Sequence, residues 1–334
     1  MNPLPCASQR YGHGRFESSA KEPTAGIDQS LSLLRSNGVP TRRTFLKAAA
    51  FSLPASGAFS QELKLADVKI ERVVAGLLFA NGPAWSHENF LIFSDVPRNK
   101  LMKLTPGEPV AVFREETQGP AGNTFDAQGR LYTCEGRGRR VVRTDKHGKI
   151  EVVAERWEGK RLNAPNDIAV RKDGEAYFTD PAFGYQQDSR ELNFFGVFHI
   201  SRKGETEVIA KPKGRPNGVA ISSNGKILYV SNSDERNVRA YDLDKNGGAS
   251  NERVLISSID GVPDGIHLDE KGNIYVAAAG LAIYSHDGKP IMTMPLSDKP
   301  SSCAFGDADL QTLYITARRS VYRVRMNVKG ATYQ

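Results

Sequence analysis

Six blocks of similar pattern repeat along the chain between residues 81 and 324. Each block has a short apolar run, a turn that carries Gly, Asp or Asn, and a second apolar run, and most add a third run with polar alternation. Their equivalent first positions are spaced by 41, 44, 51, 47 and 38 residues and fall at Asn81, Gly122, Asn166, Asn217, Asp264 and Ser302. Repeats of about 40 to 50 residues built from short strands are typical of a β-propeller, in which neighbouring units protect each other's sheet edges.

The sequence therefore predicts an all-β fold, a six-bladed β-propeller that forms one domain over residues 61–334. One unit is easily seen in residues 161–184, where the apolar runs 168–170 and 176–178 flank a turn over 171–174 and predict a hairpin. We expect the run 62–78 to supply an outer strand that closes the ring of blades against the last unit.

The innermost strands of a propeller all begin at one end of its central channel, so their first residues point at a common axis. Asn81, Asn166, Asn217 and Asp264 would ring this channel mouth, and the small residues of the other two blocks would leave space. One carboxylate with several amide oxygens suits a hard divalent cation. We expect Ca²⁺, with Mn²⁺ and Zn²⁺ as alternatives. The simpler interpretation is that Asn and Asp at turn edges bond their own backbone.

The chain from about residue 62 to 326 also resembles the senescence marker protein / gluconolactonase / luciferin-regenerating enzyme-like family, in particular its bacterial gluconolactonase branch. The resemblance lies in the stretches GPAW (82–85), FSD (93–95), EGKRLNAPNDIAV (158–170), YFTDPAFG (177–184), RPNGVAIS (215–222), PDGIHLDEKGNIYVA (263–277) and CAFGDADLQTLYITA (303–317). It implies a six-bladed propeller that holds one divalent cation, often Ca²⁺, and an activity on sugar lactones.

The resemblance implies that Asn166, Asn217 and Asp264 are metal ligands. The first block departs from the family, which usually has Glu where this chain has Asn81. The change makes the proposed metal site less negative by one charge, and it also removes a carboxylate that could accept a proton.

The expected reaction is metal-assisted hydrolysis of a cyclic ester, with a sugar lactone such as an aldonolactone as substrate. Asp264 is the first candidate for the general base, and Glu135 is the alternative because a bound cation would lower the basicity of Asp264. Arg161, Asn163 and Asn166 are candidates for substrate contacts, although a solvated loop would account for the first two equally well.

Two other functions stay open. The same ring and cation would also serve hydrolysis of arylesters or phosphotriesters. Alternatively, Asn81 would have weakened the metal site so far that the propeller binds a ligand without catalysis. Phe183 would line the pocket in either case, or it would serve loop packing, and His267 would fill the channel.

The N-terminal stretch 1–60 reads as an extension that ends in an export signal. Arg42 and Arg43 are followed by Phe-Leu-Lys and a mildly apolar segment, which resembles a twin-arginine signal, with a cleavage site just before Gln61. We therefore expect the twin-arginine export machinery as a partner and a periplasmic or secreted protein. The alternative is a surface helix of the folded domain.

Composition and charge exclude some partner classes. The net charge is +7, but residues 1–60 hold seven Lys or Arg against three acids, so only about +3 remains for the domain. A nucleic-acid surface is therefore not expected. No uncharged apolar run approaches the ~18 residues of a membrane span. Cys134 and Cys303 lack metal-binding spacing and are expected to be buried thiols, and we expect a monomer.

Overall fold

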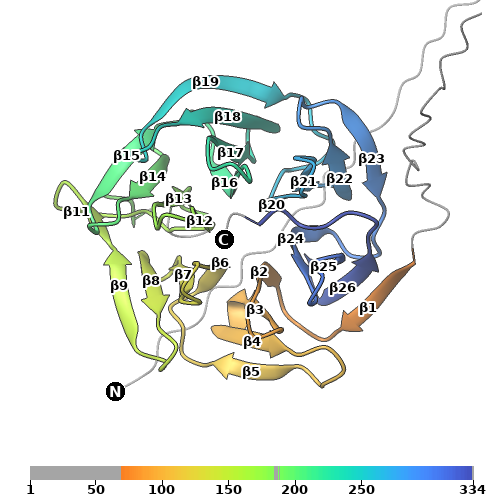
Figure 1. Cartoon of the computed structure of the whole chain (residues 1–334). Coiled ribbons are helices and arrows are strands. Elements are labelled where there is room, and N and C mark those ends of the chain that lie inside the picture. Colours follow the sequence, from red (N-terminus) through yellow and green to blue (C-terminus); the bar gives the residue numbers. More distant parts are fainter. Residues whose placement is uncertain (1–68, 184–186, 188, 333–334) are drawn as a thin grey trace, which may run out of the picture. The chain divides into compact units, whose positions relative to one another are not determined.

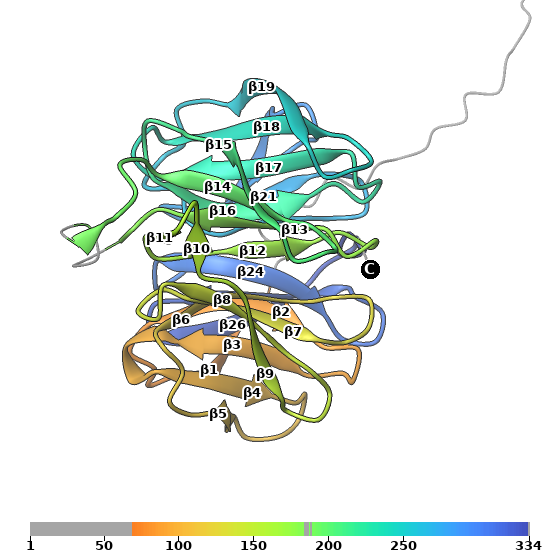
Figure 2. The same ribbon diagram turned by 90° about the vertical axis from the view of Figure 1, so that its left-hand side faces the viewer.

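A computed structural model describes residues 69–183, 187 and 189–332. These residues form six four-stranded antiparallel sheets arranged around a central axis as the blades of a propeller (Figure 1). Figure 2 shows the domain edge-on, with strands of successive blades stacked one above another. The six-bladed propeller predicted from the repeat is confirmed.

Four consecutive strands make each of the first five blades, and each blade begins with its innermost strand. The first two blades are β2 (Ala80–Trp85), β3 (Leu91–Asp95), β4 (Lys100–Leu104) and β5 (Ala111–Arg114), then β6 (Pro120–Phe125), β7 (Leu131–Glu135), β8 (Arg140–Thr144) and β9 (Ile150–Ala154). The third and fourth are β12 (Ile168–Val170), β13 (Ala176–Asp180), β14 (Gly196–Ile200) and β15 (Thr206–Ala210), then β16 (Pro216–Ile221), β17 (Ile227–Asn232), β18 (Asn237–Leu243) and β19 (Ala249–Ile256).

The fifth and sixth blades complete the ring. They are β20 (Ile266–Leu268), β21 (Ile274–Ala277), β22 (Leu281–Tyr284) and β23 (Pro290–Met294), then β24 (Pro300–Gly306), β25 (Thr312–Ala317), β26 (Ser320–Arg325) and β1 (Ile70–Val74). A short 3₁₀ helix η2 (Val96–Arg98) follows β3, and a small ribbon of β10 (Arg156–Trp157) and β11 (Lys160–Arg161) lies between the second and third blades in the sequence.

Strand β1 closes the ring of blades. It pairs antiparallel with β26, with Ile70 opposite Val324, so the first strand of the chain is the outermost strand of the last blade. The outer strand expected from the run 62–78 is therefore confirmed. This closure joins the two ends of the domain within one sheet.

Several turns between neighbouring strands have the sequence pattern Asp-x-x-Gly, and the structure shows why. In the second blade, Oδ1 of Asp126 accepts hydrogen bonds from the backbone N–H groups of Gln128 at 3.0 Å and Arg130 at 2.9 Å. Gly129 donates to the Asp126 carbonyl and has a φ of 76°, which favours glycine. The turn over 171–174 has the same backbone bond, from Gly174 to Arg171 at 2.8 Å, so the hairpin predicted there is confirmed.

The hydrophobic core lies between neighbouring blades. Large side chains such as Tyr177, Phe178 and Phe198 are fully buried, and Phe178 stacks on Phe198 with ring centroids 5.1 Å apart. Cys134 and Cys303 are both buried free thiols, as expected. Among the residues described, no helix is long and apolar enough to cross a membrane.

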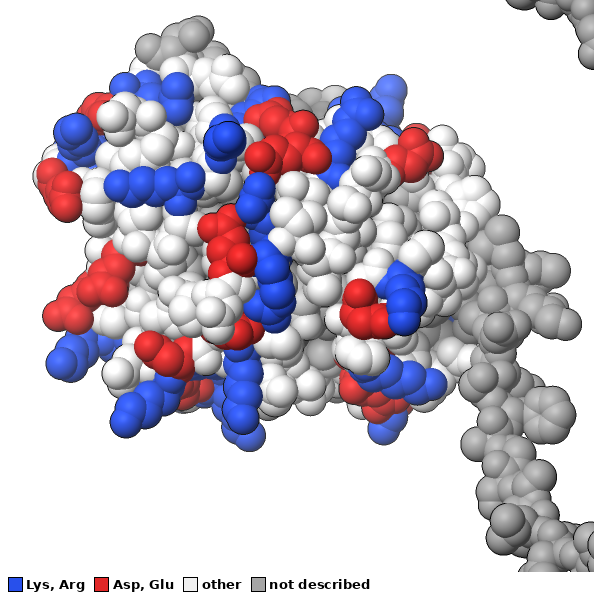
Figure 3. Space-filling model, turned by 90° about the horizontal axis from the view of Figure 1, so that it is seen from above, with Lys and Arg blue, Asp and Glu red and all other residues white. Residues whose placement is uncertain are grey.

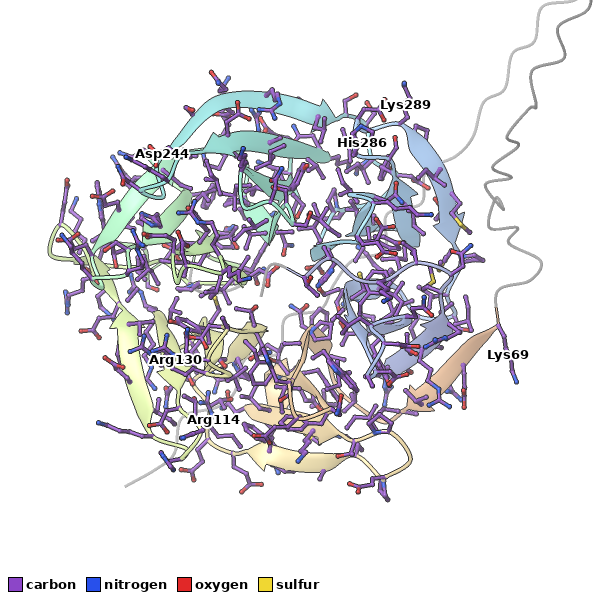
Figure 4. The ribbon with its side chains drawn as sticks, in the orientation of Figure 1. Lys69, Arg114, Arg130, Asp244, His286 and Lys289 are labelled. Carbon is purple, nitrogen blue, oxygen red and sulfur yellow. The ribbon has the colours of Figure 1, made fainter. Side chains whose placement is uncertain are left out.

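Charged side chains lie mainly on the rim. On the face in Figure 3, basic and acidic groups are interspersed. The labelled His286 and Lys289 lie at the outer edge of the fifth blade (Figure 4), far from the channel. The rim contains ion pairs such as Arg253 with Asp242 at 2.8 Å.

Candidate active site at the channel mouth

The innermost strands begin at equivalent positions around the channel mouth. Backbone bonds between adjacent blades show the equivalence, because Gly122 donates to the Asn166 carbonyl at 2.7 Å, Gly218 to Asp264 at 3.2 Å and Gly265 to Ser301 at 2.7 Å. The equivalent positions form what we call the mouth ring, which consists of Asn81, Ala121, Asn166, Asn217, Asp264 and Ser301.

Two of the six predicted positions are therefore corrected by one residue. Gly122 and Ser302 were expected in the ring, but Ala121 and Ser301 occupy those positions. Register shifts near the start of β6 and β24 also occur in β2 and β16, where the expected positions are correct, so the repeats of the second and sixth blades align one residue earlier than expected. A proline precedes the ring residue in blades two to six, and Pro120 and Pro300 would have given the correct alignment.

Three predicted metal ligands are in contact. Nδ2 of Asn166 donates a hydrogen bond to Oδ1 of Asn217 at 2.6 Å, across the boundary between the third and fourth blades. Nδ2 of Asn217 donates to Oγ of Ser233 at 2.9 Å and to the Pro263 carbonyl at 3.5 Å, so its amide is held in one orientation. The Asp264 carboxylate accepts a hydrogen bond from the Asn217 side chain. Asn217 thus links its two neighbours in the ring.

Asn81 occupies its ring position but is engaged locally. Its Oδ1 accepts the backbone N–H of Gly82 at 2.8 Å, and the side chain is buried. This bond to its own backbone is the simpler arrangement considered for turn-edge asparagines. The other three ring residues with amide or carboxylate groups bond one another instead.

A second partly buried carboxylate, that of Asp167, lies near Asp264 and was not among the predicted site residues. Asp167 follows Asn166, and its Oδ2 accepts the backbone N–H of Val219 at 3.0 Å. Burial raises the pKa of Asp167 to about 7, and the nearby negative charge of Asp264 adds to the effect. Burial also raises the pKa of Asp264 to about 7, against the opposing influence of Lys299 and Arg318. The sequence does contain a signal for Asp167. The residue after the ring position is Gly in blades one, two, four and five, whereas the third blade has Asp167 there.

Glycine at the position after the ring residue makes room for this carboxylate. A Cβ on Gly122 would lie 2.2 Å from Oδ1 of Asp167 and 2.8 Å from the Asn166 carbonyl oxygen. A Cβ on Gly218 would lie 2.6 Å from the Asp264 carbonyl oxygen. The inner strands therefore approach each other more closely than any side chain would allow.

A pocket of about 280 Å³ opens beside two ring residues, Ala121 and Asn166, and is lined by residues of the first three blades. Its walls are mostly apolar. The residues that line it are Val96, Pro97, Gly119, Ala121, Gly136, Arg137, Ala164, Pro165, Asn166 and Phe183. Phe183, one of the expected pocket aromatics, is therefore part of this wall, with the guanidinium of Arg215 over its ring at 5.0 Å.

Below the ring, a narrow cavity of about 90 Å³ continues down the channel. Asp167, Asn123 and His267 line it, so His267 does face the channel as expected. Burial lowers the pKa of His267, and its Nδ1 accepts the backbone N–H of Leu268 at 2.9 Å. At the far end, the chain over 329–332 crosses the channel, with Ala331 donating to the Leu268 carbonyl at 3.0 Å.

Asn163 lies within the loop that precedes Asn166 and is completely buried. Its Nδ2 donates to the backbone carbonyls of Asp180 at 3.1 Å and Phe194 at 3.0 Å. The Asp180 carboxylate in turn accepts the backbone N–H groups of Asn163 at 2.7 Å and Ala164 at 2.6 Å, so it caps the loop. In this arrangement the Asn163 side chain holds the loop that carries Asn166 and does not join the ring.

Arg161 is engaged beside the same loop. Its Nη2 donates to the Gly138 carbonyl at 3.2 Å, and its backbone N–H donates to Oε2 of Glu191 at 2.8 Å. It does not line the pocket over the ring, which leaves its predicted substrate contact a prediction.

Glu135, the alternative base, is buried between two arginines. Its Oε1 lies 2.9 Å from Nη2 of Arg114, and its Oε2 lies 2.8 Å from Nη2 of Arg140. Both carboxylate oxygens are therefore occupied by guanidinium groups, and this arrangement favours Asp264 as the base.

The family relationship follows from comparison with known proteins. A family model described as the SMP-30/Gluconolactonase/LRE-like region matches residues 66–319. The chain belongs to this family. A gluconolactonase from Zymomonas mobilis is 33% identical over 295 residues, which cover 78% of this chain and 82% of that protein. A pentonolactonase from Haloferax volcanii is 27% identical over 252 residues, or 70% of this chain and 80% of the relative.

Solved structures of other family members have the same fold. A gluconolactonase from Xanthomonas campestris superposes with a TM-score of 0.73 at 30% identity, and covers 78% of this chain and 91% of that structure. A structure described as a putative gluconolactonase gives a TM-score of 0.75 at 26% identity, over 80% of this chain and 95% of that structure. The resemblance found in the sequence motifs is thus confirmed across the propeller.

Proposed function

We propose that the protein hydrolyses a sugar lactone to the corresponding aldonic acid, with the reacting carbonyl at the mouth ring and a divalent cation as cofactor. Family membership and the two lactonase relatives make the chain an enzyme of the lactonase type. The observation that carries the assignment to this site is the contact of Asn166, Asn217 and Asp264, of which Asn166 also lines an open pocket.

The donor groups of the ring fit a hard cation. The ring supplies amide oxygens and one carboxylate, and a second carboxylate, Asp167, lies beside it. Both carboxylates are partly buried, and neither forms an ion pair with a described residue, so a positive charge would be stabilised at this place. Among the described residues, no group of three or more His, Cys, Asp or Glu side chains is arranged to hold a metal. A cation at the ring would therefore take amide oxygens for most of its protein ligands, which suits Ca²⁺ better than Zn²⁺.

Asn166, Asn217 and Asp264 would hold the cation, and Asn81 would join them if its amide left Gly82. A bound divalent cation would polarise the lactone carbonyl and stabilise the oxyanion that forms on attack by water. Asp264 would accept the proton of this water at a carboxylate oxygen. Asn217 orients Asp264 through their hydrogen bond. The loop fastened by Asn163 and Asp180 keeps Asn166 at the ring.

The ester bond between the acyl carbon and the ring oxygen then breaks. The ring oxygen of the lactone becomes a hydroxyl group by taking up the proton that Asp264 would return. The acyl carbon becomes that of the product carboxylate. The apolar pocket walls, Val96, Pro97 and Phe183 among them, would exclude bulk water from the substrate.

The test is hydrolysis of D-gluconolactone by the purified protein, with Ca²⁺, Mn²⁺ or Zn²⁺ and with a chelator. Metal-dependent turnover that is lost in Asp264→Asn would support the proposal. Turnover of arylesters or phosphotriesters but of no lactone would show that the substrate of this site belongs to another class of ester. Metal binding without any turnover would favour a ligand-binding propeller.

Export stays a proposal. The twin-arginine motif at Arg42 and Arg43 and the cleavage site before Gln61 lie outside the described residues. We infer from the sequence alone that this segment directs the propeller to the periplasm or the medium.

A further inference from the structure

The pocket over the mouth ring has a single charged side chain among the described residues that line it. This side chain is Arg137, and the other lining residues are apolar, small or, in the case of Asn166, a neutral amide. A charged group that faces an apolar pocket fixes the orientation of a ligand and selects its charge.

Arg137 is placed by its backbone. It lies at the tip of the turn between β7 and β8, which is attached to the loop entering the second blade. Gly136 donates to the Gly119 carbonyl at 2.8 Å, and Gly138 donates to the Gln118 carbonyl at 2.9 Å. A Cβ on Gly119 would lie 2.8 Å from Cβ of Arg137, so the arginine stem packs directly on this glycine.

The other arginines of the same turn have structural partners. Nε of Arg139 donates to the Leu162 carbonyl at 2.6 Å, and Nε of Arg140 donates to Glu135 at 2.8 Å. Arg137 is exposed, and no described residue forms a hydrogen bond or ion pair with its guanidinium group. The turn thus contains two arginines that hold the fold and one that is available to a ligand.

Two further basic side chains lie at the same end of the propeller as the mouth ring. Lys299 precedes Pro300 and the ring residue Ser301, and Arg318 lies in the turn between β25 and β26 with its guanidinium 5.2 Å from the ring of Phe79. Neither forms an ion pair with a described residue. The positive charge of Arg137 is therefore reinforced around the mouth.

We propose that the preferred substrates are lactones that carry an anionic group, a carboxylate or a phosphate, at the end remote from the lactone carbonyl. The inference rests on the proposed function, which puts the carbonyl at the mouth ring. Because Arg137 and the ring residues Ala121 and Asn166 line the same pocket, a molecule whose carbonyl lies at the ring would have its remote end within reach of Arg137. A guanidinium group binds carboxylate and phosphate through paired hydrogen bonds.

The experiment compares two lactones that differ at one group. The γ-lactone of D-glucaric acid ends in a carboxylate, and the γ-lactone of D-gluconic acid ends in a hydroxymethyl group at the same carbon. Gluconolactone phosphorylated on its terminal hydroxyl tests phosphate as the anion. We would measure kcat/KM for all three with the wild type, with R137A and R137K, and with R72A as a control. Arg72 is an exposed arginine on β1, the outermost strand.

We expect the wild type to prefer one or both anionic lactones. In R137A this preference should fall by roughly tenfold or more, through KM, because a charge-assisted pair of hydrogen bonds is lost. The preference for anionic lactones should be partly restored in R137K and unchanged in R72A. Added salt should weaken this preference.

Equal or faster hydrolysis of the neutral lactone, with the ratio unchanged in R137A, would overturn the inference and leave the lactonase function intact. Absence of hydrolysis for all three lactones would overturn both. A circular-dichroism spectrum and melting curve of R137A would show that a loss of preference does not come from misfolding.

Discussion

The side chain of Asn166 donates a 2.6 Å hydrogen bond to the side chain of Asn217, although the two residues belong to different blades. Asn166 lies two residues before β12, and Asn217 is the second residue of β16, the innermost strands of their blades. Each follows a proline. The bond joins the third and fourth blades at the axis of the propeller. Asn217 also bonds Asp264, so the three side chains form a connected chain of hydrogen bonds.

Asn217→Ala should weaken cation binding by roughly tenfold or more, because it removes one proposed oxygen ligand and the hydrogen bond to Asp264. Calorimetric titration with Ca²⁺ measures the change. Asn246→Ala is the matched control, since Asn246 is exposed in the turn after β18. Equal affinities in both variants would contradict the assigned ring.

Asn81→Glu should strengthen cation binding and raise turnover at subsaturating metal. The change adds a carboxylate to a ring that holds only one, and ligand charge raises the affinity for divalent cations. The same variant should be less stable without metal, because a further charge is then buried without a partner. Paired melting curves with chelator and with Ca²⁺ would reveal the opposite shifts. A variant destabilised in both conditions, with unchanged affinity, would place residue 81 outside the site.

The metal-free protein should lose stability as the pH rises from about 4 to about 7. Burial raises the pKa of Asp167 and Asp264 to about 7 in the folded protein, above the value of about 3.9 for an exposed aspartate. Their protonated forms therefore stabilise the fold, an effect that is complete at low pH and is lost as the pH passes the folded pKa. Denaturant melts in chelator across this range measure the decline.

Asp264→Asn isolates one of these carboxylates. Above pH 7 and without metal, this variant should be more stable than the wild type, by an amount on the order of a few kcal/mol. Below about pH 4 the two proteins should converge. A wild type whose stability rises through this interval would show that a cation or an unrecognised partner keeps both carboxylates charged.

Gly122→Ala should destabilise the protein by about 2 kcal/mol or more, because the new Cβ would meet Asp167 and the Asn166 backbone. Gly136→Ala is a matched control in the same blade. Its nearest neighbour would be the Pro165 carbonyl oxygen at 3.4 Å, and its φ is not positive. Urea denaturation compares the two variants. Similar losses in both would mean that the inner strands can move apart to accept a side chain.

Export is tested by replacing the paired arginines. Arg42→Lys combined with Arg43→Lys should retain the precursor in the cytoplasm, and the wild-type chain should begin near Gln61 after export. Cell fractionation with N-terminal sequencing gives both results. A wild-type protein that is found in the cytoplasm with residues 1–60 still attached would contradict the export signal.

The repeat predicted the fold because its turns and strand lengths are local features. Each Asp-x-x-Gly turn closes within a few residues, as at Asp126 and Gly129, so its signal is complete in the sequence. The closure by β1 followed from the same logic, since six blades need a strand to complete the last sheet.

The site was only partly predictable from the sequence. The contact of Asn166, Asn217 and Asp264 followed from repeat equivalence, but two ring positions, Ala121 and Ser301, lie one residue before the expected ones. Asp167 was missed because its carboxylate is accommodated by Gly122 of another blade. The burial of Asn163 and the two arginine partners of Glu135 depend on chain segments far away in sequence, which a local pattern does not encode.

The most direct test of the central claim is a Ca²⁺ titration of the purified wild-type protein by calorimetry, followed by a gluconolactone assay at saturating metal. We expect one bound cation per chain, binding that is weaker by roughly tenfold or more in Asn217→Ala, and metal-dependent turnover. A folded wild-type protein that binds none of Ca²⁺, Mn²⁺ and Zn²⁺, and whose activity is unaffected by chelator, would contradict it.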